Sequence, residues 1–240
     1  MTKHSGIIYF ILPAYDPDEK ILAVVRELAE KKSADAQILI VDDGSTPTHR
    51  KTCFAPLETL PDVTVLRHEV NRGKGAALKT AFCFILQQNA PALGGVTADC
   101  DGQHSVEDML KAAKFLRQNP DSLILGCRGF SDDLPWKSRV GNRLTKWIFR
   151  VLLHRPLADT QTGLRGIPAS QMASYAGLPG NGFEFETQML LATPQGKFFE
   201  FPIETIYFDQ NSGTHFHPVK DTLRIYGVIF RFFFRRGKQK

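Results

Sequence analysis

The sequence contains few cysteines, and none of them forms a closely spaced pair. Cys53, Cys83, Cys100 and Cys127 stand alone among 240 residues, with no Cys-x-x-Cys motif. Disulfide-rich secreted domains and structural zinc sites both require cysteines that recur at short spacings. The isolated cysteines therefore argue against a disulfide framework and a zinc site, and we expect a protein of the reducing cytoplasm.

Long hydrophobic runs are also missing. The apolar run at 7–12 ends at Pro13, so it is too short for the hydrophobic region of a signal peptide. No segment approaches the roughly 20 apolar residues that a membrane-spanning helix needs. We therefore expect a protein that is soluble or bound peripherally to a membrane.

Basic residues are not spread along the chain, although the formal net charge is +5. The segment 221–240 carries all of this excess, with Asp221 as its only acid. Its basic residues are Arg224, Arg231, Arg235, Arg236, Lys238 and Lys240. A nearly neutral body with a basic end differs from the basic surface of a nucleic-acid-binding protein, so we expect no nucleic-acid partner.

The first half of the chain alternates short β-branched runs with stretches of helical periodicity. We expect strands at 7–12, 38–41, 63–66, 95–98 and 122–127, and helices at 21–31, 75–88 and 106–118. Asp16 or Asp18 is placed to cap the first of these helices. This order predicts an α/β fold with a mainly parallel sheet covered by helices on both faces.

The second half is less regular, and it contains no repeat, linker or low-complexity tract. We expect helices at 137–153, 185–192 and 219–234, a loop at 159–165 and a strand pair at 198–208. The chain is therefore expected to form a single domain with an amphipathic helix at its C-terminal end.

Two carboxylates follow the strand expected at 95–98. Asp99 and Asp101 stand one residue apart, followed by Gln103 and His104. Carboxylate oxygens are hard ligands that suit Mg²⁺ or Mn²⁺ and leave positions open for phosphate oxygens. The alternative is a solvated, Asp-rich turn.

Two further motifs follow strands whose carboxyl ends should meet at the same edge of the sheet. Asp42 and Asp43 close the second strand, where they can either bind a nucleobase or cap the next helix. Gly73, Lys74 and Gly75 open a helix, and glycines at a helix N-terminus allow an anionic ligand to approach the backbone.

The order of these motifs resembles family-2 glycosyltransferases of the GT-A type. The resemblance continues at 126–128, which looks like the Gly-Ser-Arg of that family. The segments 141–143 and 159–165 are similar to the subgroup of dolichyl-phosphate mannose synthases and polyprenyl-phosphate glycosyltransferases. The segments 204–207 and 212–224 are also similar to bacterial members of that subgroup. Cys100 stands where alanine is more usual and Asp16 where asparagine is common, but neither departure removes a carboxylate or a cation.

The resemblance implies a Rossmann-like GT-A fold and an inverting, metal-dependent hexosyltransferase that uses a nucleotide-diphosphate sugar. Residues at the ends of the early strands and in the segment 71–75, which we call the glycine loop, would bind this donor: Pro13, Ala14, Tyr15, Asp16, Asp42, Asp43, Gly73 and Lys74. Asp99, Asp101 and Gln103 would hold Mg²⁺ or Mn²⁺ on the diphosphate.

Chemistry at the sugar requires that the leaving diphosphate be stabilised, which a metal and nearby guanidinium groups do electrostatically. Arg128 and Arg139 are the candidate cations. Asp159, Glu184 and Glu186 are candidates for positioning the acceptor or acting as base, although both glutamates can also be exposed acids at a helix start. A polyprenyl phosphate is already anionic at neutral pH, whereas a hydroxyl acceptor needs a base.

The C-terminal segment 219–240 predicts a basic amphipathic helix. Val219, Leu223, Tyr226, Phe230 and Phe233 recur at helical spacing among arginines, a pattern typical of a helix that lies on an anionic membrane surface. The alternative is that this stripe packs on the domain. We thus divide the chain into a catalytic domain at 1–218, with a nucleotide-sugar half up to about 130, and the tail at 219–240.

The expected function is transfer of a sugar to a polyprenyl phosphate by a cytoplasmic enzyme on the inner face of a membrane. Two alternatives remain open: a transferase acting on a soluble or glycan hydroxyl, and a catalytically silent membrane adaptor with the same fold. The sequence does not fix the sugar, the base or the oligomeric state.

Overall fold

Seven strands form one sheet in the order β3-β2-β1-β4-β6-β5-β7. The structure is a computed structural model, and it describes residues 6–128, 148–150, 156–204 and 218–237. The strands are β1 (Ile7–Ala14), β2 (Ala36–Asp42), β3 (Val63–Arg67), β4 (Ala92–Thr97), β5 (Leu123–Arg128), β6 (Arg165–Pro168) and β7 (Phe198–Ile203). All neighbouring strands run parallel except β6, which is antiparallel to β4 and β5. The predicted mainly parallel sheet is confirmed.

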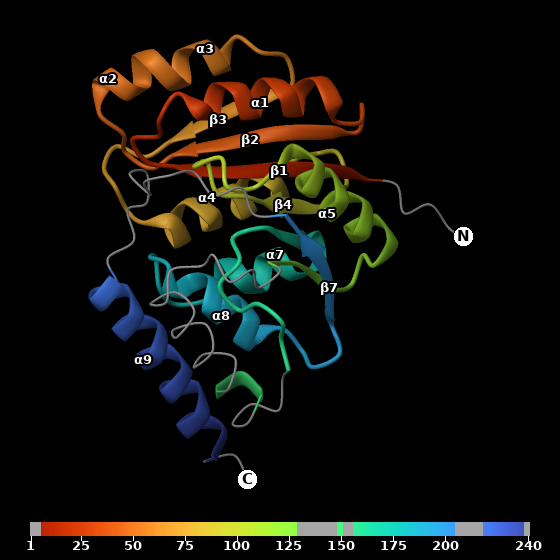
Figure 1. Ribbon diagram of the computed structural model, residues 1–240, viewed down its shortest axis with the longest axis vertical. Coiled ribbons are helices and arrows are strands. Elements are labelled where there is room, and N and C mark those ends of the chain that lie inside the picture. Colours follow the sequence, from red (N-terminus) through yellow and green to blue (C-terminus); the bar gives the residue numbers. More distant parts are fainter. Residues whose placement is uncertain (1–5, 129–147, 151–155, 205–217, 238–240) are drawn as a thin grey trace.

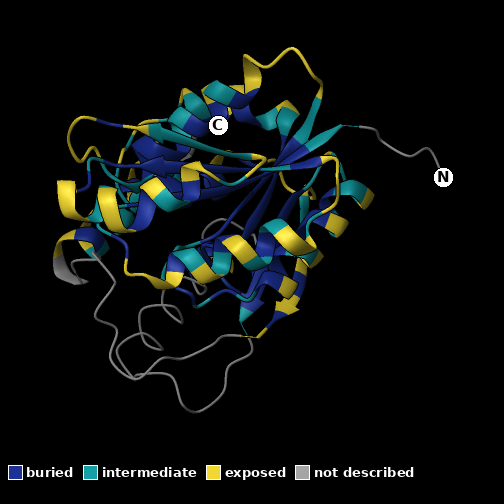
Figure 2. Cartoon of the chain, turned by 90° about the horizontal axis from the view of Figure 1, so that it is seen from above, coloured by how far each residue is buried: buried dark blue, intermediate teal, exposed yellow. Residues whose placement is uncertain are grey.

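Helices cover both faces of this sheet (Figure 1). Alternate residues of β1 point to opposite faces, so Ile8 and Phe10 join one core cluster while Tyr9 and Ile11 join the other. Figure 2 shows the buried sheet between helices whose outer faces are exposed. The first cluster packs against α1 (Lys20–Lys31), η1 (Arg50–Phe54), α3 (Ala55–Glu58) and α5 (Val106–Gln118). The second packs against α4 (Lys74–Leu86), α7 (Ala169–Ala176), α8 (Glu184–Ala192) and α9 (Pro218–Gly237).

The starts of α1 and α5 are held by different hydrogen bonds. Ser105 Oγ accepts the N–H of Asp108 at 3.1 Å, which satisfies one of the free donors in the first turn of α5. Asp18 Oδ1 accepts the N–H of Lys20 at 2.8 Å at the start of α1. The N-cap residue of α1 is Glu19, which makes no side-chain capping bond, so neither Asp16 nor Asp18 is the N-cap, although Asp18 binds the first helical N–H from the position before it.

Five elements were not expected from the sequence. Residues 47–58 are helical, through α2 (Pro47–His49), η1 and α3, and the segment after 164 forms β6 and α7. Arg165 thus begins a strand and does not end a loop. Strand β6 has the sequence Arg-Gly-Ile-Pro, which carries no β-branched run, and it is held by pairing on both sides.

Some expected elements fall partly outside the described residues. Of the helix expected at 137–153, only 148–150 is described, and it is helical. Of the strand pair expected at 198–208, β7 is described, and it pairs in parallel with β5. The division of the chain at residue 218 stays a prediction.

Helix α9 is amphipathic and packs beside α8, on the side of the molecule away from α1 and α3 (Figure 1). Val228 and Ile229, which do not belong to the predicted stripe, are buried in the core, so α9 packs on the domain through a different face. The stripe residues Leu223, Phe230 and Phe233 are exposed, as is Phe234. Across the described ranges, no helix combines the length and the apolarity needed to cross a membrane.

Candidate active site

The candidate site lies beyond the carboxyl ends of β1 and β4. From β1, the sheet continues to β2 on one side and to β4 on the other, and ligands of open parallel sheets bind at such a reversal point. A pocket of about 350 Å³ lies there. Its wall contains eight of the predicted site residues: Pro13, Ala14, Tyr15, Asp43, Gly73, Lys74, Asp99 and Asp101.

Lys74 connects two carboxylates at the centre of this pocket. Its Nζ lies 2.6 Å from Asp99 Oδ1 and 2.9 Å from Glu186 Oε2, so that residues from α4, the end of β4 and α8 meet. Burial disfavours the ammonium, but the attraction of Asp99 and Glu186 outweighs it and raises the pKa of Lys74. Burial likewise opposes the charge on Asp99, yet Lys74 keeps the pKa of Asp99 below its usual range.

Asp101 differs from Asp99 in its surroundings. Gly102 adopts a φ of 80°, and Asp101 Oδ1 accepts the N–H of Gln103 at 3.0 Å, which fixes a tight turn after β4. Burial, together with the negative charge of Asp99, raises the pKa of Asp101. A divalent cation beside the two carboxylates would relieve this repulsion.

The residues present fit a metal that also binds the donor. The described part of the chain contains no group of three or more His, Cys, Asp or Glu side chains that could hold an ion alone. Mg²⁺ usually binds one or two carboxylates together with substrate phosphates, and Asp99 and Asp101 supply such a pair. The third predicted ligand, Gln103, follows the turn, and its role stays a prediction.

Asp43 holds the glycine loop in place. Its Oδ1 accepts the N–H of Arg72 at 2.9 Å and its Oδ2 accepts the N–H of Gly73 at 2.7 Å. Gly73 has a φ of 98°, a conformation that glycine adopts without strain. The loop that delivers Lys74 to the pocket is therefore fixed by a carboxylate at the end of β2.

Asp42 lies behind the pocket wall. It is 0% exposed, its Oδ1 accepts the N–H of Ser45 at 2.7 Å, and its Oδ2 accepts Nε of Arg50 at 2.9 Å. Both oxygens thus already bind protein groups. The alternative of a helix cap is wrong, because the next helix, α2, has Thr46 as its N-cap residue and no side-chain capping bond, and contact of Asp42 with a nucleobase stays a prediction.

Asp16 connects two loops at the edge of the pocket and is not itself part of the pocket wall. Its Oδ1 accepts the N–H of Thr46 at 2.8 Å, and its own N–H donates to Ser45 Oγ at 2.9 Å. These bonds connect the loop after β1 to the loop after β2. They hold Asp16 at a φ of 41°, which is uncommon for a residue with a side chain.

Arg128 and Asp159 form a second ion pair. Arg128 Nε donates to Asp159 Oδ2 at 2.7 Å and Nη2 donates to Oδ1 at 3.2 Å, while Asp159 is 0% exposed. Burial opposes the charge on Asp159, but the hydrogen bond and charge of Arg128 lower its pKa. Neither residue is part of the pocket wall, and the predicted Arg139 lies outside the described residues.

Several site residues were missed by the sequence analysis. Arg165 is buried, donates Nη1 to the carbonyl of Glu186 at 2.7 Å, and lies 3.8 Å from Glu186 Oε1. Glu186 is only 8% exposed, so the alternative of an exposed helix-start acid is wrong for it. Phe183, Asp221 and Arg224 contribute to the pocket wall. The resemblance around 212–224 was the one signal that included two of them.

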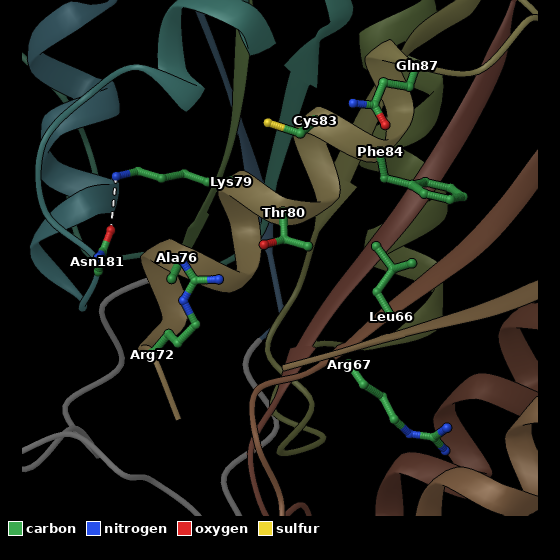
Figure 3. A pocket seen from close by; sticks show the side chains of 10 residues that line it. All are labelled: Leu66, Arg67, Arg72, Ala76, Lys79, Thr80, Cys83, Phe84, Gln87 and Asn181. Carbon is green, nitrogen blue, oxygen red and sulfur yellow. Dashed lines mark hydrogen bonds between the residues drawn. The ribbon is translucent and has the colours of Figure 1, made fainter. Parts of the chain in front are cut away.

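A further cavity of about 520 Å³ lies on the outer side of α4, beside β3 (Figure 3). Lys79 extends from α4 across the edge of this cavity, and its Nζ donates to Gly180 O at 2.8 Å and to Asn181 Oδ1 at 3.1 Å. None of the predicted site residues lines this cavity. Its contribution to the site is indirect, because Lys79 holds Gly180 and Asn181, which directly precede Gly182 in the pocket wall.

One known protein family matches most of this chain. The model of the family described as "Glycosyl transferase family 2" matches residues 9–173, more than half of the chain. The chain belongs to glycosyl transferase family 2. The matched residues include β1, the glycine loop and both carboxylates of the Asp99–Asp101 pair.

Curated relatives and solved structures agree with this assignment. The chain is 28% identical to a UDP-N-acetylglucosamine–dolichyl-phosphate N-acetylglucosaminyltransferase of Methanococcus voltae, over 84% of this chain and 86% of that protein. It is 28% identical to a dolichyl-phosphate beta-glucosyltransferase of Saccharomyces cerevisiae, over 75% and 60%.

Among solved structures, glucosyl-3-phosphoglycerate synthase from Mycobacterium tuberculosis with UDP superposes with a TM-score of 0.72. It is 16% identical, over 96% of this chain and 81% of that chain. This likeness shows that the two chains share a fold.

Proposed function

We propose that the protein transfers one sugar, with inversion, from a nucleotide-diphosphate sugar to a polyprenyl phosphate at the cytoplasmic face of a membrane. One observation carries this proposal: a lysine and a pair of carboxylates, Asp99 and Asp101, meet in a pocket beyond β1 and β4. Cations and metal-binding carboxylates at such a place are what a diphosphate leaving group requires.

In the proposed mechanism, the pocket binds the donor and stabilises the leaving diphosphate. Asp99 and Asp101 would hold Mg²⁺ or Mn²⁺, which supplies Lewis-acid stabilisation to the diphosphate when bound. A solved neighbour of the same fold contains Mn²⁺ together with UDP. Lys74, already fully ionised, would add a second positive charge beside the same phosphates, while Pro13, Ala14 and Tyr15 would border the nucleoside.

The proposed acceptor follows from the ion pairs of the two carboxylates that are candidates for the base. Glu186 is paired with Lys74, and Asp159 with Arg128, so both carboxylates position cations. An acceptor whose nucleophile is already anionic needs no base, and a phosphate monoester has a second pKa near ~6. Two curated relatives are named as transferases to dolichyl phosphate, which supports a lipid phosphate as acceptor.

Membrane contact is proposed to occur through α9. Leu223 and Phe234 are 67% and 65% exposed, and both lie on a helix that also carries arginines. Insertion of such a face into the interface, with its cations near anionic headgroups, would bring the site close to its lipid acceptor.

Transfer of a labelled sugar tests this proposal. The purified protein is given each labelled UDP-, GDP- and dTDP-sugar with Mn²⁺ and one of three acceptors: a polyprenyl phosphate, the matching polyprenol, or 3-phosphoglycerate. We expect labelled product only with the polyprenyl phosphate, and none with Asp101→Ala. Transfer to 3-phosphoglycerate alone would establish the soluble-acceptor alternative, and no transfer from any donor would favour the silent adaptor.

A further inference from the structure

Two cavities meet at the candidate active site. The second, of about 700 Å³, is lined by the glycine loop, the 179–182 segment, α8 and α9, and we call it the α8–α9 groove. It shares Asn71, Gly73, Gly182 and Arg224 with the pocket described above. The groove therefore opens directly from the place where the donor is proposed to bind.

The two cavities differ in charge. The pocket wall is rich in carboxylates: Asp18, Asp43, Asp99, Asp101 and Asp221. The groove wall instead carries three arginines, Arg72, Arg224 and Arg231, with Glu184 as its one acid among the residues that line it. A wall of this kind favours an anion, and guanidinium groups are well suited to phosphate oxygens.

Arg224 occupies the junction of the two cavities. It is 50% exposed, and its Nη1 lies 3.6 Å from Asp221 Oδ1, a separation longer than a hydrogen bond. The guanidinium is thus held near the pocket by charge, with its donors not taken up by this carboxylate.

Helix α9 places an apolar surface next to these arginines. At 3.6 residues per turn, Arg224 and Arg231 fall on one side of the helix, between the buried Val228 and the exposed stripe that includes Leu223 and Phe230. Arginines at such a boundary keep the charge in water while their stems cover apolar surface. The groove thus runs from a polar junction to an apolar helix face.

The opposite wall of the groove is fixed by local hydrogen bonds. Glu184 Oε1 accepts the N–H groups of Asn181 and Gly182, both at 3.1 Å, and Lys79 holds the same segment from the other side (Figure 3). A Cβ atom at Gly182 would lie 2.7 Å from Glu184 Oε2 and 3.6 Å from Arg224 Nη1. Glycine at this position therefore keeps the junction open.

We propose that the α8–α9 groove binds the phosphate end of the lipid acceptor. Arg224 contacts the phosphate at the junction, and the apolar chain leaves along α9, past Val228 and Phe232, toward the exposed stripe. This inference rests on the proposed function, because it names the place where that acceptor binds. A soluble phosphate would satisfy the arginines but leave the apolar side of the groove unused.

Acceptor kinetics test the groove. With donor and Mn²⁺ saturating, Arg224→Gln should raise the KM for a short-chain prenyl phosphate by about tenfold or more, because a charge-assisted hydrogen bond is lost. The KM for the donor should rise by a smaller factor, and Arg224→Lys should recover part of the acceptor affinity. The matched control is Arg26→Gln, an exposed arginine of α1, which should leave both constants unchanged.

Competition distinguishes the two sources of phosphate. A prenyl phosphonate, which offers the same anionic oxygens, should compete with the acceptor in the wild type and more weakly in Arg224→Gln, whereas inorganic phosphate should not compete at the same concentration. Equal competition by inorganic phosphate would overturn the lipid part of the proposal. An unchanged acceptor KM in folded Arg224→Gln would overturn the groove while leaving the function intact, whereas a wild type that ignores every prenyl phosphate would defeat the function itself.

Discussion

Lys74 Nζ lies 2.6 Å from Asp99 Oδ1, so a lysine of α4 neutralises the first carboxylate of the proposed metal-binding pair. The same ammonium group lies 2.9 Å from Glu186 Oε2. The charges of two acids from distant parts of the chain are thus balanced by one cation. The side chains of Lys74 and Glu186 are 12% and 11% exposed, whereas Asp99 is 35% exposed, so the loss of the cation would leave the charge of Glu186 uncompensated in a medium of low polarity.

Replacement of this lysine should therefore destabilise the protein. We expect Lys74→Gln to lower the free energy of unfolding by roughly 3 kcal/mol, as measured by urea denaturation at pH 7. Mn²⁺ without donor should recover more stability in the variant than in the wild type, because the ion replaces the missing charge.

Lys31→Gln is the matched control for this variant. Lys31 also bridges two carboxylates, Glu27 at 2.7 Å and Glu107 at 2.6 Å, but all three side chains are exposed. Its replacement should cost much less stability than that of Lys74 and create no additional response to Mn²⁺. Equal losses in the two variants would show that the Lys74 pairs are not buried as described.

A side chain at Gly163 should displace Asp99. A Cβ atom there would lie 2.3 Å from Asp99 Oδ2, so in Gly163→Ala the carboxylate must move. We expect Mn²⁺-dependent donor affinity, measured by calorimetry, to fall by about a hundredfold, with a stability loss of roughly 1 to 3 kcal/mol.

Gly177→Ala is the corresponding control, because a Cβ atom at Gly177 meets nothing closer than 3.6 Å. Donor affinity should stay at the wild-type value in that variant. Wild-type affinity in Gly163→Ala would instead mean that the position of Asp99 does not matter for donor binding.

The buried pair of Asp159 and Arg128 should make stability depend on pH. Because the pKa of Asp159 is lowered in the folded protein, its contribution is present above the unfolded value of about 3.9 and is lost as pH falls through the folded value. Asp159→Asn should thus cost roughly 3 kcal/mol at pH 7 and progressively less below about pH 4.

Urea denaturation from pH 7 down to pH 3 measures this difference. Asp121→Asn serves as control, since Asp121 forms a 4.0 Å surface pair with Lys197 and should contribute little at any pH. A penalty for Asp159→Asn that stays constant below pH 4 would contradict the assignment.

The exposed face of α9 should determine membrane binding. Replacing Phe230 and Phe234 together by serine removes two exposed aromatic side chains, and we expect co-sedimentation with vesicles containing anionic lipids to fall at least tenfold. Leu86→Ser removes an exposed apolar side chain from α4 and should leave binding unchanged. Unchanged binding by the double variant would place the membrane contact elsewhere.

The first half of the fold was predictable because its signals are local. Buried strands such as β1 are continuous apolar runs, and the motif residues follow them directly in the chain. The carboxyl ends of parallel strands meet at one edge, so the meeting of Lys74 with Asp99 followed from strand order alone.

The structure of the second half could not be predicted in the same way, because it depends on contacts between residues that are distant in the chain. Strand β6 contains Gly166 and Pro168 and exists because two partners pair with it, which a local pattern does not reveal. Glu186 was a predicted site residue, but its ion pair with Lys74 was not predicted, because only tertiary packing brings together two residues 112 positions apart. A fully buried arginine such as Arg165 gives no sequence signal that separates it from a surface arginine.

The most direct test of the central claim is a thermal-shift screen of the folded protein with UDP-, GDP- and dTDP-sugars, each with and without Mn²⁺. Because a ligand stabilises the folded state that it binds, we predict a Mn²⁺-dependent rise in Tm with one nucleotide, lost in Asp101→Ala. No rise with any donor, on protein that unfolds cooperatively, would contradict the assignment of this pocket to a nucleotide-sugar donor.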